Sequence, residues 1–189
     1  MAASPVRRLR ADAQRNRDAI LRAAREAFAT EGIFAPMDRI ATAAGLGNAT
    51  LYRNFPTRED LLAAVMDDSV DELLADSTQL ERTLGAEAAL RAWLYELAWR
   101  LRIWQDLPTC VATAYADTTS PVQTMCGRLT ERTGDFLDRY RREGERVSSI
   151  TAGEVFELVT AVAWAIDRFG DDPQQARRRV EFATTGVFV

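Results

Sequence analysis

The stretch MDRIATAAGLGNATLYRNFPTR, residues 37–58, decides the fold. Its first half predicts a short helix, because Met37, Ile40, Ala41 and Ala44 recur at helical spacing and can face a core. Gly45 follows, and a glycine adopts the positive φ of a helix stop without steric cost. A tight turn and a second short helix are therefore expected directly after it.

The second half of the stretch predicts a helix with one apolar and one polar face. Asn48 is a suitable N-cap, and Leu51 and Phe55 lie four residues apart and can turn inward. Pro56 cannot continue a helix, so this element ends near Phe55. The side chains left facing outward carry amide, hydroxyl and guanidinium groups: Asn48, Thr50, Tyr52, Arg53 and Asn54. Two helices joined in this way are typical of a helix-turn-helix that reads DNA.

The segment IATAAGLGNATLYRNFPTREDLLAAV, residues 40–65, resembles the DNA-binding segment of the TetR family of bacterial transcriptional regulators. The resemblance covers roughly the first third of the chain, and Pro36 departs from it, since the family usually has a Ser or Thr cap there. It implies an all-α fold, with an N-terminal three-helix helix-turn-helix domain and a larger C-terminal domain for ligand binding and dimerisation. The matching residues are Ile40-Ala41, Ala44-Gly45, Thr50-Leu51-Tyr52, Phe55-Pro56 and Leu61-Leu62, preceded by Ile20-Leu21, Ala24, Ala27-Phe28 and Gly32.

The first residues of a reader helix point into the major groove, where polar side chains meet base edges. Asn48, Thr50 and Arg53 are the expected base contacts, and Ala49 is small enough to let the helix approach closely. The resemblance implies contacts to phosphates from Thr42, Tyr52, Asn54 and Arg58. The complete set of expected DNA-binding residues is Thr42, Gly47, Asn48, Ala49, Thr50, Tyr52, Arg53, Asn54 and Arg58.

Charge is distributed unevenly along the chain. The net charge is −4, yet residues 1–58 hold ten arginines against five acidic residues. This asymmetry suits a protein that presents one end to phosphate. The sequence contains no histidine, which removes the commonest general base and metal ligand and weighs against an enzyme. No metal or other cofactor is expected, and the absence of a signal sequence or a long apolar run predicts a cytoplasmic protein.

Helical periodicity along the chain predicts the helices, and the resemblance implies what each part of the chain does. Residues 1–11 are expected to form a disordered basic arm, residues 12–58 the DNA-binding domain, and residues 59–189 an effector-binding and dimerisation domain. Thr57 and Asp60 have the spacing of a capping box and open a long helix that ends near Gly85. Further helices are expected over residues 86–105, 108–115, 121–142 and 151–169, and from Pro173 onward.

The aromatic side chains of the C-terminal part could line an apolar cavity between helices, although such residues more often form a core. Arg100 lies near the same face and could pair with an acidic effector. The expected pocket residues are Met66, Trp93, Leu97, Arg100, Trp104, Met125, Leu129, Phe136 and Trp164.

The predicted helix over residues 151–169 is apolar around most of its circumference, which indicates either an association surface or burial within its own subunit. The resemblance implies that the last two helices of two subunits pack as a four-helix bundle. The expected interface residues are Phe156, Val159, Ala163, Phe182 and Thr185.

These features together predict a homodimeric repressor that binds a palindromic DNA operator and is released by a small apolar or amphipathic effector. One alternative is a redox-responsive regulator that uses Cys110 and Cys126, although buried and inert cysteines are the more economical interpretation. Another is a helical enzyme or ligand-storage protein with a vestigial helix-turn-helix.

Overall fold

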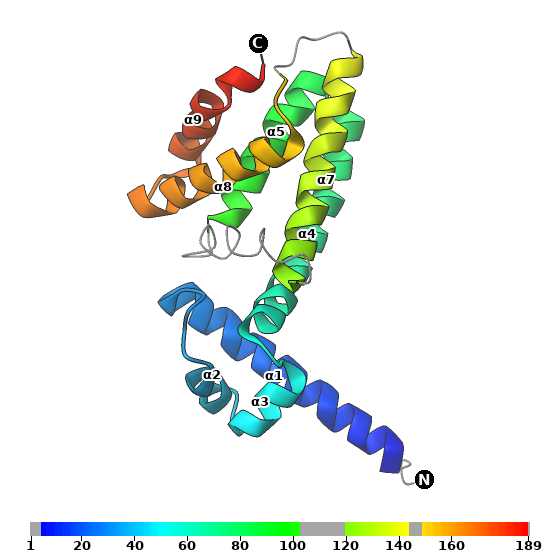
Figure 1. Cartoon of the computed structure of the whole chain (residues 1–189), viewed down its shortest axis with the longest axis vertical. Coiled ribbons are helices and arrows are strands. Elements are labelled where there is room, and N and C mark those ends of the chain that lie inside the picture. The colour runs from blue at the N-terminus through cyan, green and yellow to red at the C-terminus, as the bar shows by residue number, and fades with distance from the viewer. Residues whose placement is uncertain (1–4, 103–119, 144–148, 189) are drawn as a thin grey trace. The chain divides into compact units, whose positions relative to one another are not determined.

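The computed structural model describes residues 5–102, 120–143 and 149–188, with side chains from Ala11 onward. The chain forms two compact units, residues 1–66 and 67–189, and the boundary falls within one helix, α4 (Arg58–Thr83). Figure 1 shows the order of the elements along each unit. Throughout the described residues the regular structure is helical, as the sequence predicted.

The first unit contains α1 (Pro5–Glu31), α2 (Met37–Ala43), α3 (Asn48–Asn54) and the first turns of α4. Helix α1 packs against both α2 and α3, and the side chains between them are fully or almost fully buried. The expectation of a disordered arm over residues 1–11 is wrong from Pro5 onward, because α1 already begins there. The core residues of this unit include Ile20, Ala24, Phe28, Ile33, Ile40, Ala41, Leu51 and Phe55.

The second unit is built around α5 (Ala86–Leu101), which packs against α7 (Pro121–Arg142), α8 (Ala152–Phe169) and α9 (Pro173–Ala183). A short 3₁₀ helix, η1 (Thr185–Val187), follows α9. The predicted helix over residues 108–115 lies outside the described residues. Across the part of the chain that the structure describes, no helix combines the length and the apolar character needed to cross a membrane.

Local sequence signals set several helix starts. Thr57 and Asp60 form the predicted capping box, with the Thr57 N–H donating to the Asp60 carboxylate at 2.9 Å and the Asp60 N–H donating to the Thr57 hydroxyl at 3.1 Å. Thr151 and Glu154, which have the same spacing, form another capping box at the start of α8. Asp172 caps α9 directly before Pro173, which occupies the first helical position. These caps fix the chain direction on entry to α4, α8 and α9.

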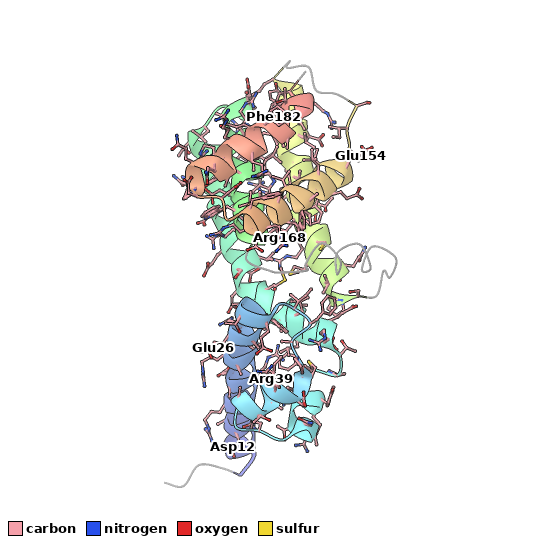
Figure 2. The ribbon with its side chains drawn as sticks, turned by 90° about the vertical axis from the view of Figure 1, so that its left-hand side faces the viewer. Asp12, Glu26, Arg39, Glu154, Arg168 and Phe182 are labelled. Carbon is pink, nitrogen blue, oxygen red and sulfur yellow. The ribbon has the colours of Figure 1, made fainter. Side chains whose placement is uncertain are left out.

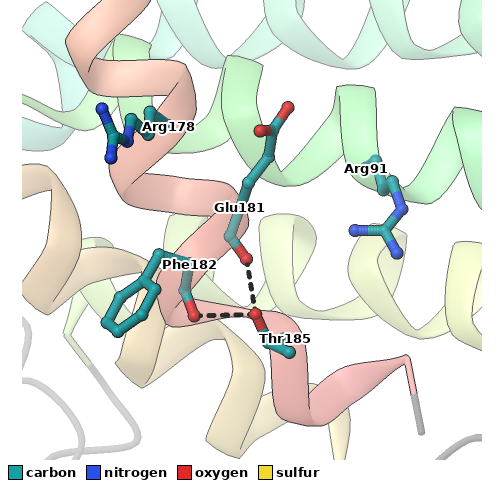
Figure 3. Close-up of a pocket in the computed structure, with 5 residues that line it drawn as sticks. All are labelled: Arg91, Arg178, Glu181, Phe182 and Thr185. Atoms are coloured by element: carbon teal, nitrogen blue, oxygen red, sulfur yellow. Dashed lines mark hydrogen bonds between the residues drawn. The ribbon is translucent and has the colours of Figure 1, made fainter.

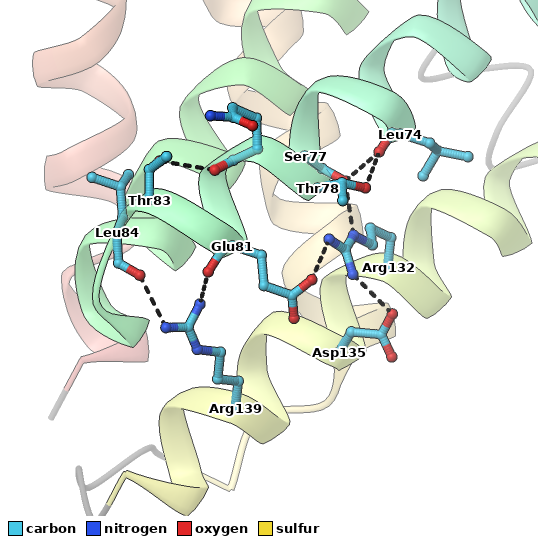
Figure 4. A network of polar contacts seen from close by, with 10 residues as sticks. Leu74, Ser77, Thr78, Glu81, Thr83, Leu84, Arg132, Asp135 and Arg139 are labelled. Atoms are coloured by element: carbon cyan, nitrogen blue, oxygen red, sulfur yellow. Dashed lines mark hydrogen bonds and ion pairs between the residues drawn. The ribbon is translucent and has the colours of Figure 1, made fainter.

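Arginines of α7 hold the second half of α4 by polar contacts (Figure 4). The Arg132 guanidinium donates to the Ser77 hydroxyl and to the Glu81 carboxylate, both at 2.8 Å. Arg139 donates to the backbone carbonyls of Glu81 and Leu84 at 2.7 and 2.9 Å, near the end of α4. A cation beside the last carbonyls of a helix satisfies orphan acceptors and complements the helix dipole.

Candidate nucleic-acid interface

The turn between α2 and α3 is closed by backbone hydrogen bonds around Gly45. The Gly45 N–H donates to the Thr42 carbonyl at 3.0 Å, and the Leu46 N–H donates to the Ala41 carbonyl at 2.9 Å. This is the Schellman pattern, and it requires the left-handed conformation that Gly45 adopts at a φ of 70°. The turn therefore depends on glycine at this position, as the sequence predicted.

Helix α3 presents one apolar and one polar face, as expected. Leu51 and Phe55 are buried against the unit, and the Arg17 guanidinium of α1 lies 4.6 Å from the centre of the Phe55 ring. The expected N-cap is wrong by one residue, because Gly47 occupies that position and makes no side-chain cap. Asn48 is instead the first residue of the helix and is exposed, so its amide is not held by a capping bond to the helix.

The polar face of α3 carries most of the predicted DNA-binding side chains. Gly47, Asn48, Ala49 and Arg53 are exposed, and Tyr52 is 49% exposed although it is aromatic. The Arg53 guanidinium donates to the Thr50 hydroxyl at 3.0 Å, one turn back along the helix. The Asn54 amide donates to the Thr50 carbonyl at 2.8 Å, so this side chain is folded onto its own helix.

Two further predicted phosphate contacts lie outside α3 and differ in their surroundings. The Thr42 hydroxyl is on an exposed position of α2 and donates to the Asp38 carbonyl at 2.9 Å. The Arg58 guanidinium turns back toward the segment between α1 and α2, where one of its nitrogens donates to the Ile33 and Ala35 carbonyls. Sequence reasoning missed both this contact and that of Arg17 with Phe55, because neither follows from spacing along one helix.

The exposed Asn48 amide and Arg53 guanidinium, with the half-buried Thr50 between them on the same short helix, can donate to and accept from base edges. The two neighbouring helices are held by a buried core, so these groups project from a preorganised frame. The chemistry of the face suits hydrogen-bonded recognition of a polar, negatively charged partner such as duplex DNA.

The predicted effector-pocket residues are divided between core and surface. Met66 is buried in the first unit; Trp93, Leu97, Met125, Leu129 and Phe136 are buried in the second. The Trp93 and Phe136 rings stack with centres 5.5 Å apart, and the Trp93 indole N–H donates to the Thr133 hydroxyl at 2.9 Å. These side chains therefore satisfy one another within the helical core.

Among the described residues, two of the predicted pocket residues are not part of that core. Trp164 is 50% exposed on α8, so the expectation that it lines the interior is wrong. Arg100 pairs with Glu72 and Asp76 of α4 at 3.3 and 3.2 Å, and thus faces acidic side chains of the chain itself. Trp104 lies outside the described residues.

The predicted dimer-interface residues also fall into two groups. Phe156, Val159 and Ala163 are buried within the subunit, so their assignment to an intersubunit surface is wrong. The physical reason is that α8 packs against α5, α7 and α9 at once, which uses most of its apolar circumference. Phe182 and Thr185 are exposed, and Phe182 is 85% exposed.

An open groove of about 520 Å³ lies beside Phe182 on the second unit (Figure 3). Its lining combines the guanidinium groups of Arg91 and Arg178, the Glu181 carboxylate and the Thr185 hydroxyl with the Phe182 ring. Figure 2 shows Phe182 of α9 and Arg168 of α8 on the side that faces the viewer. Aromatic and arginine side chains together are characteristic of protein–protein contact surfaces.

Neither cysteine chemistry nor a metal centre is supported by the described residues. Cys126 is a buried thiol on α7, and Cys110 lies outside the described residues. Within the described ranges no three His, Cys, Asp or Glu side chains come together in a way that could hold a metal ion.

Two family models match the chain. Residues 20–65 match the family described as bacterial regulatory proteins, tetR family, and residues 85–188 match the SbtR-like transcriptional regulator C-terminal domain. The first match contains α2, α3 and the turn between them, and the second contains α5, α7, α8 and α9. Among curated proteins no sequence matches the chain.

Solved structures of the same fold cover almost the whole chain. A TetR transcriptional regulator from Streptomyces coelicolor is 30% identical, and the alignment covers 91% of this chain and 98% of that one with a TM-score of 0.58. A TetR-family chain from Rhodococcus sp. is 20% identical, with coverage of 93% and 100% and a TM-score of 0.66. FadR from Bacillus subtilis, crystallised with stearoyl-CoA, is 16% identical, with coverage of 89% and 98% and a TM-score of 0.64.

Proposed function

The chain belongs to the TetR family of bacterial regulatory proteins and is a transcriptional regulator with an N-terminal DNA-binding domain, and from that premise we propose that it acts as a homodimeric repressor. It binds a palindromic operator and is released from it by a small apolar or amphipathic effector. The observation that carries this proposal is the α3 surface, where exposed polar side chains alternate with the buried anchors Leu51 and Phe55.

Asn48, Thr50 and Arg53 contact bases in the proposed complex, and Ala49 allows close approach or touches a thymine methyl. The exposed amide of Asn48 suits adenine and the guanidinium of Arg53 suits guanine, because these side chains can form two hydrogen bonds to those bases. Thr42 and Tyr52 contact phosphates, which fixes the register of α3 in the groove without reading sequence. The Asn54 amide donates to the Thr50 carbonyl, so we propose that Asn54 supports DNA binding by holding the polar face of α3.

The proposed dimer uses the exposed faces of α8 and α9. Trp164 and Phe182 supply the apolar contacts, and Thr185 lies at the edge of the groove beside Phe182. A two-fold interface places the same surface on both subunits, so Arg178 of one subunit can approach Glu181 of the other. Arg178 and Glu181 of the groove would then each have a partner of opposite charge on the other subunit. Phe156, Val159 and Ala163 stay in the core of their own subunit in this dimer.

The proposed effector site lies among α5, α7 and α8, where Trp93, Met125, Leu129 and Phe136 form a continuous apolar core. An effector that binds there must separate side chains that now pack together, and it would favour a different arrangement of the helices. The stearoyl-CoA bound to FadR is an example of an amphipathic ligand held by this fold. A ligand with a long apolar part suits a site lined mainly by apolar side chains.

The test is DNA binding by the purified chain, measured as fluorescence anisotropy on a duplex selected from a random pool. We expect tight, saturable binding of two chains per palindromic duplex and much weaker binding to a scrambled duplex of equal length. Affinity should fall steeply with salt, by about 0.9 in log K per log salt unit for each phosphate neutralised.

Sedimentation of the free protein completes the test. We expect a dimer at micromolar concentration. A series of fatty-acyl ligands is then added to the protein–DNA complex, and we expect one or more of them to release the DNA. Equal affinity for the selected and scrambled duplexes, or binding as a monomer, would contradict the proposal. A ligand that strengthens DNA binding would contradict the release mechanism alone.

A further inference from the structure

The first residue of α4, Arg58, makes a contact that spans two segments of the DNA-binding unit. One of its guanidinium nitrogens donates to the Ile33 carbonyl at 2.9 Å and to the Ala35 carbonyl at 2.5 Å. Both acceptors lie between α1 and α2, more than twenty residues upstream. Hydrogen bonds from a charged donor are stronger than neutral ones, so this contact holds the two segments together.

The segment that Arg58 holds is short and otherwise fixed by its own side chains. Gly32 ends α1 at a φ of 81°, and the Ala35 N–H donates to the Gly32 carbonyl at 3.0 Å. Ile33 and Ala35 are buried, so their side chains anchor the loop while their carbonyls turn to Arg58. Carbonyls outside a helix need such a donor when water is excluded.

The start of α2 lacks the side-chain cap that would otherwise fix it. Its N-cap is Pro36, which makes no side-chain hydrogen bond to the helix. The entry angle of α2 therefore depends on the loop before it, whose Ile33 and Ala35 carbonyls accept from Arg58. Through this loop, the Arg58 contact helps to set the orientation of α2, the first helix of the helix-turn-helix.

The position of Arg58 on its own helix indicates that helix stability is not the reason for an arginine there. A cation in the first turn is unfavourable beside the positive end of the helix dipole. Glu59 and Asp60 follow directly and offset that effect, and Asp60 also closes the capping box with Thr57. Arg58 therefore contributes through its hydrogen bonds to the Ile33 and Ala35 carbonyls and not through the stability of α4.

We propose that Arg58 is a positioning residue for DNA recognition, acting through the loop between α1 and α2 and not through a DNA phosphate. The first turn of α4 already follows α3 directly in the chain, through Pro56 and Thr57. The Arg58 contact adds the entry of α2, so both helices of the helix-turn-helix are tied to the same turn. The inference rests on the proposed DNA-binding function, but the contact itself exists without DNA.

Two measurements on Arg58→Gln separate the alternatives. Hydrogen exchange of the Ala35 amide in the free protein should become roughly tenfold to a hundredfold faster, the factor that corresponds to loss of a charged hydrogen bond. Affinity for the selected duplex should fall, while the slope of log K against log salt stays at the wild-type value. Removal of a phosphate contact would instead reduce that slope by about 0.9 per subunit.

Arg58→Lys and Arg39→Gln provide the controls. An ammonium group can donate to both carbonyls, so the lysine variant should recover much of the exchange protection and the affinity. Arg39 pairs with Glu31 at 2.7 Å on the surface of the same unit, and its replacement should leave Ala35 exchange unchanged.

The inference is overturned if Arg58→Gln leaves Ala35 exchange unchanged, or if the salt slope falls by about one charge per subunit. If wild-type protein shows no preference for any duplex, the proposed function fails. In that case the exchange measurement still decides whether Arg58 holds the loop.

Discussion

Replacement of Thr133 by Val tests whether the aromatic residues of the second unit form a satisfied core. The Thr133 hydroxyl accepts from the Trp93 indole N–H at 2.9 Å and itself donates to the Leu129 carbonyl at 2.8 Å. Both Trp93 and Thr133 are completely buried. Valine has nearly the same shape, so Thr133→Val removes the acceptor without opening a cavity and leaves the indole N–H unsatisfied.

An unsatisfied buried donor costs about 1–3 kcal/mol. The free energy of unfolding of the second unit should fall by about that amount, with a drop in its melting temperature of roughly 3–6 °C per kcal/mol for a unit of this size. All four tryptophans of the chain, at positions 93, 99, 104 and 164, belong to this unit. Urea unfolding followed by tryptophan fluorescence therefore reports the second unit alone.

Thr83→Val is the matched control. Its hydroxyl also donates to the carbonyl four residues back, at 2.8 Å from the Gln79 oxygen, but the side chain is exposed. We expect a change within about 0.5 kcal/mol there. If Thr133→Val costs no more than this control, the indole N–H must find water as a replacement. Trp93 would then border a hydrated cavity, and the packed-core account would be refuted.

Three further predictions concern the dimer, pH and the contacts of α4. Phe182→Asp should raise the dimer dissociation constant, measured by sedimentation, by about a hundredfold or more, because a central aromatic contributes about 2–4 kcal/mol to an interface. The control is Phe34→Asp, on an exposed residue of the first unit, which should leave the dissociation constant unchanged. The Thr151 N–H and hydroxyl hold the pKa of the Glu154 carboxyl below its ordinary value, so its stabilising effect is complete above that value and is lost as the pH falls through the lowered pKa. Glu154→Gln should therefore weaken the loss of thermal stability on acidification, and identical pH profiles would contradict the assignment. Arg132→Met should lower the free energy of unfolding of the second unit by about 1–3 kcal/mol. The Arg132 side chain is only 16% exposed, and its replacement removes the cation that pairs with Glu81 and Asp135. A change below about 0.5 kcal/mol in urea unfolding would contradict a stabilising role for the α4–α7 network.

Features set by neighbouring residues in the chain could be predicted from the sequence. The capping boxes at Thr57 and Thr151 depend on side chains three residues apart, and both form. The inward direction of Leu51 and Phe55 follows from helical period, and both are buried. The residue-type matches over residues 40–65 were specific enough to identify the family.

Features set by contacts between distant segments could not be predicted in the same way. Helical period shows that α8 is apolar on most sides, but it does not show whether another helix of the same chain or a second subunit covers each side. Phe156 is therefore a predicted interface residue that the structure has in the core. The acceptors of Arg58 lie more than twenty residues away, so no local pattern reveals them.

The central claim is that the exposed face of α3 reads base sequence, and the preference profile of Arg53→Ala tests it most directly. Affinities of wild type and variant are measured for the selected duplex and for every single-base change in it. The account predicts that the variant loses discrimination, worth about 1–3 kcal/mol, at one position of each half-site and keeps it elsewhere. A variant whose affinity falls by the same factor for every duplex, or whose affinities equal those of the wild type, would contradict this claim.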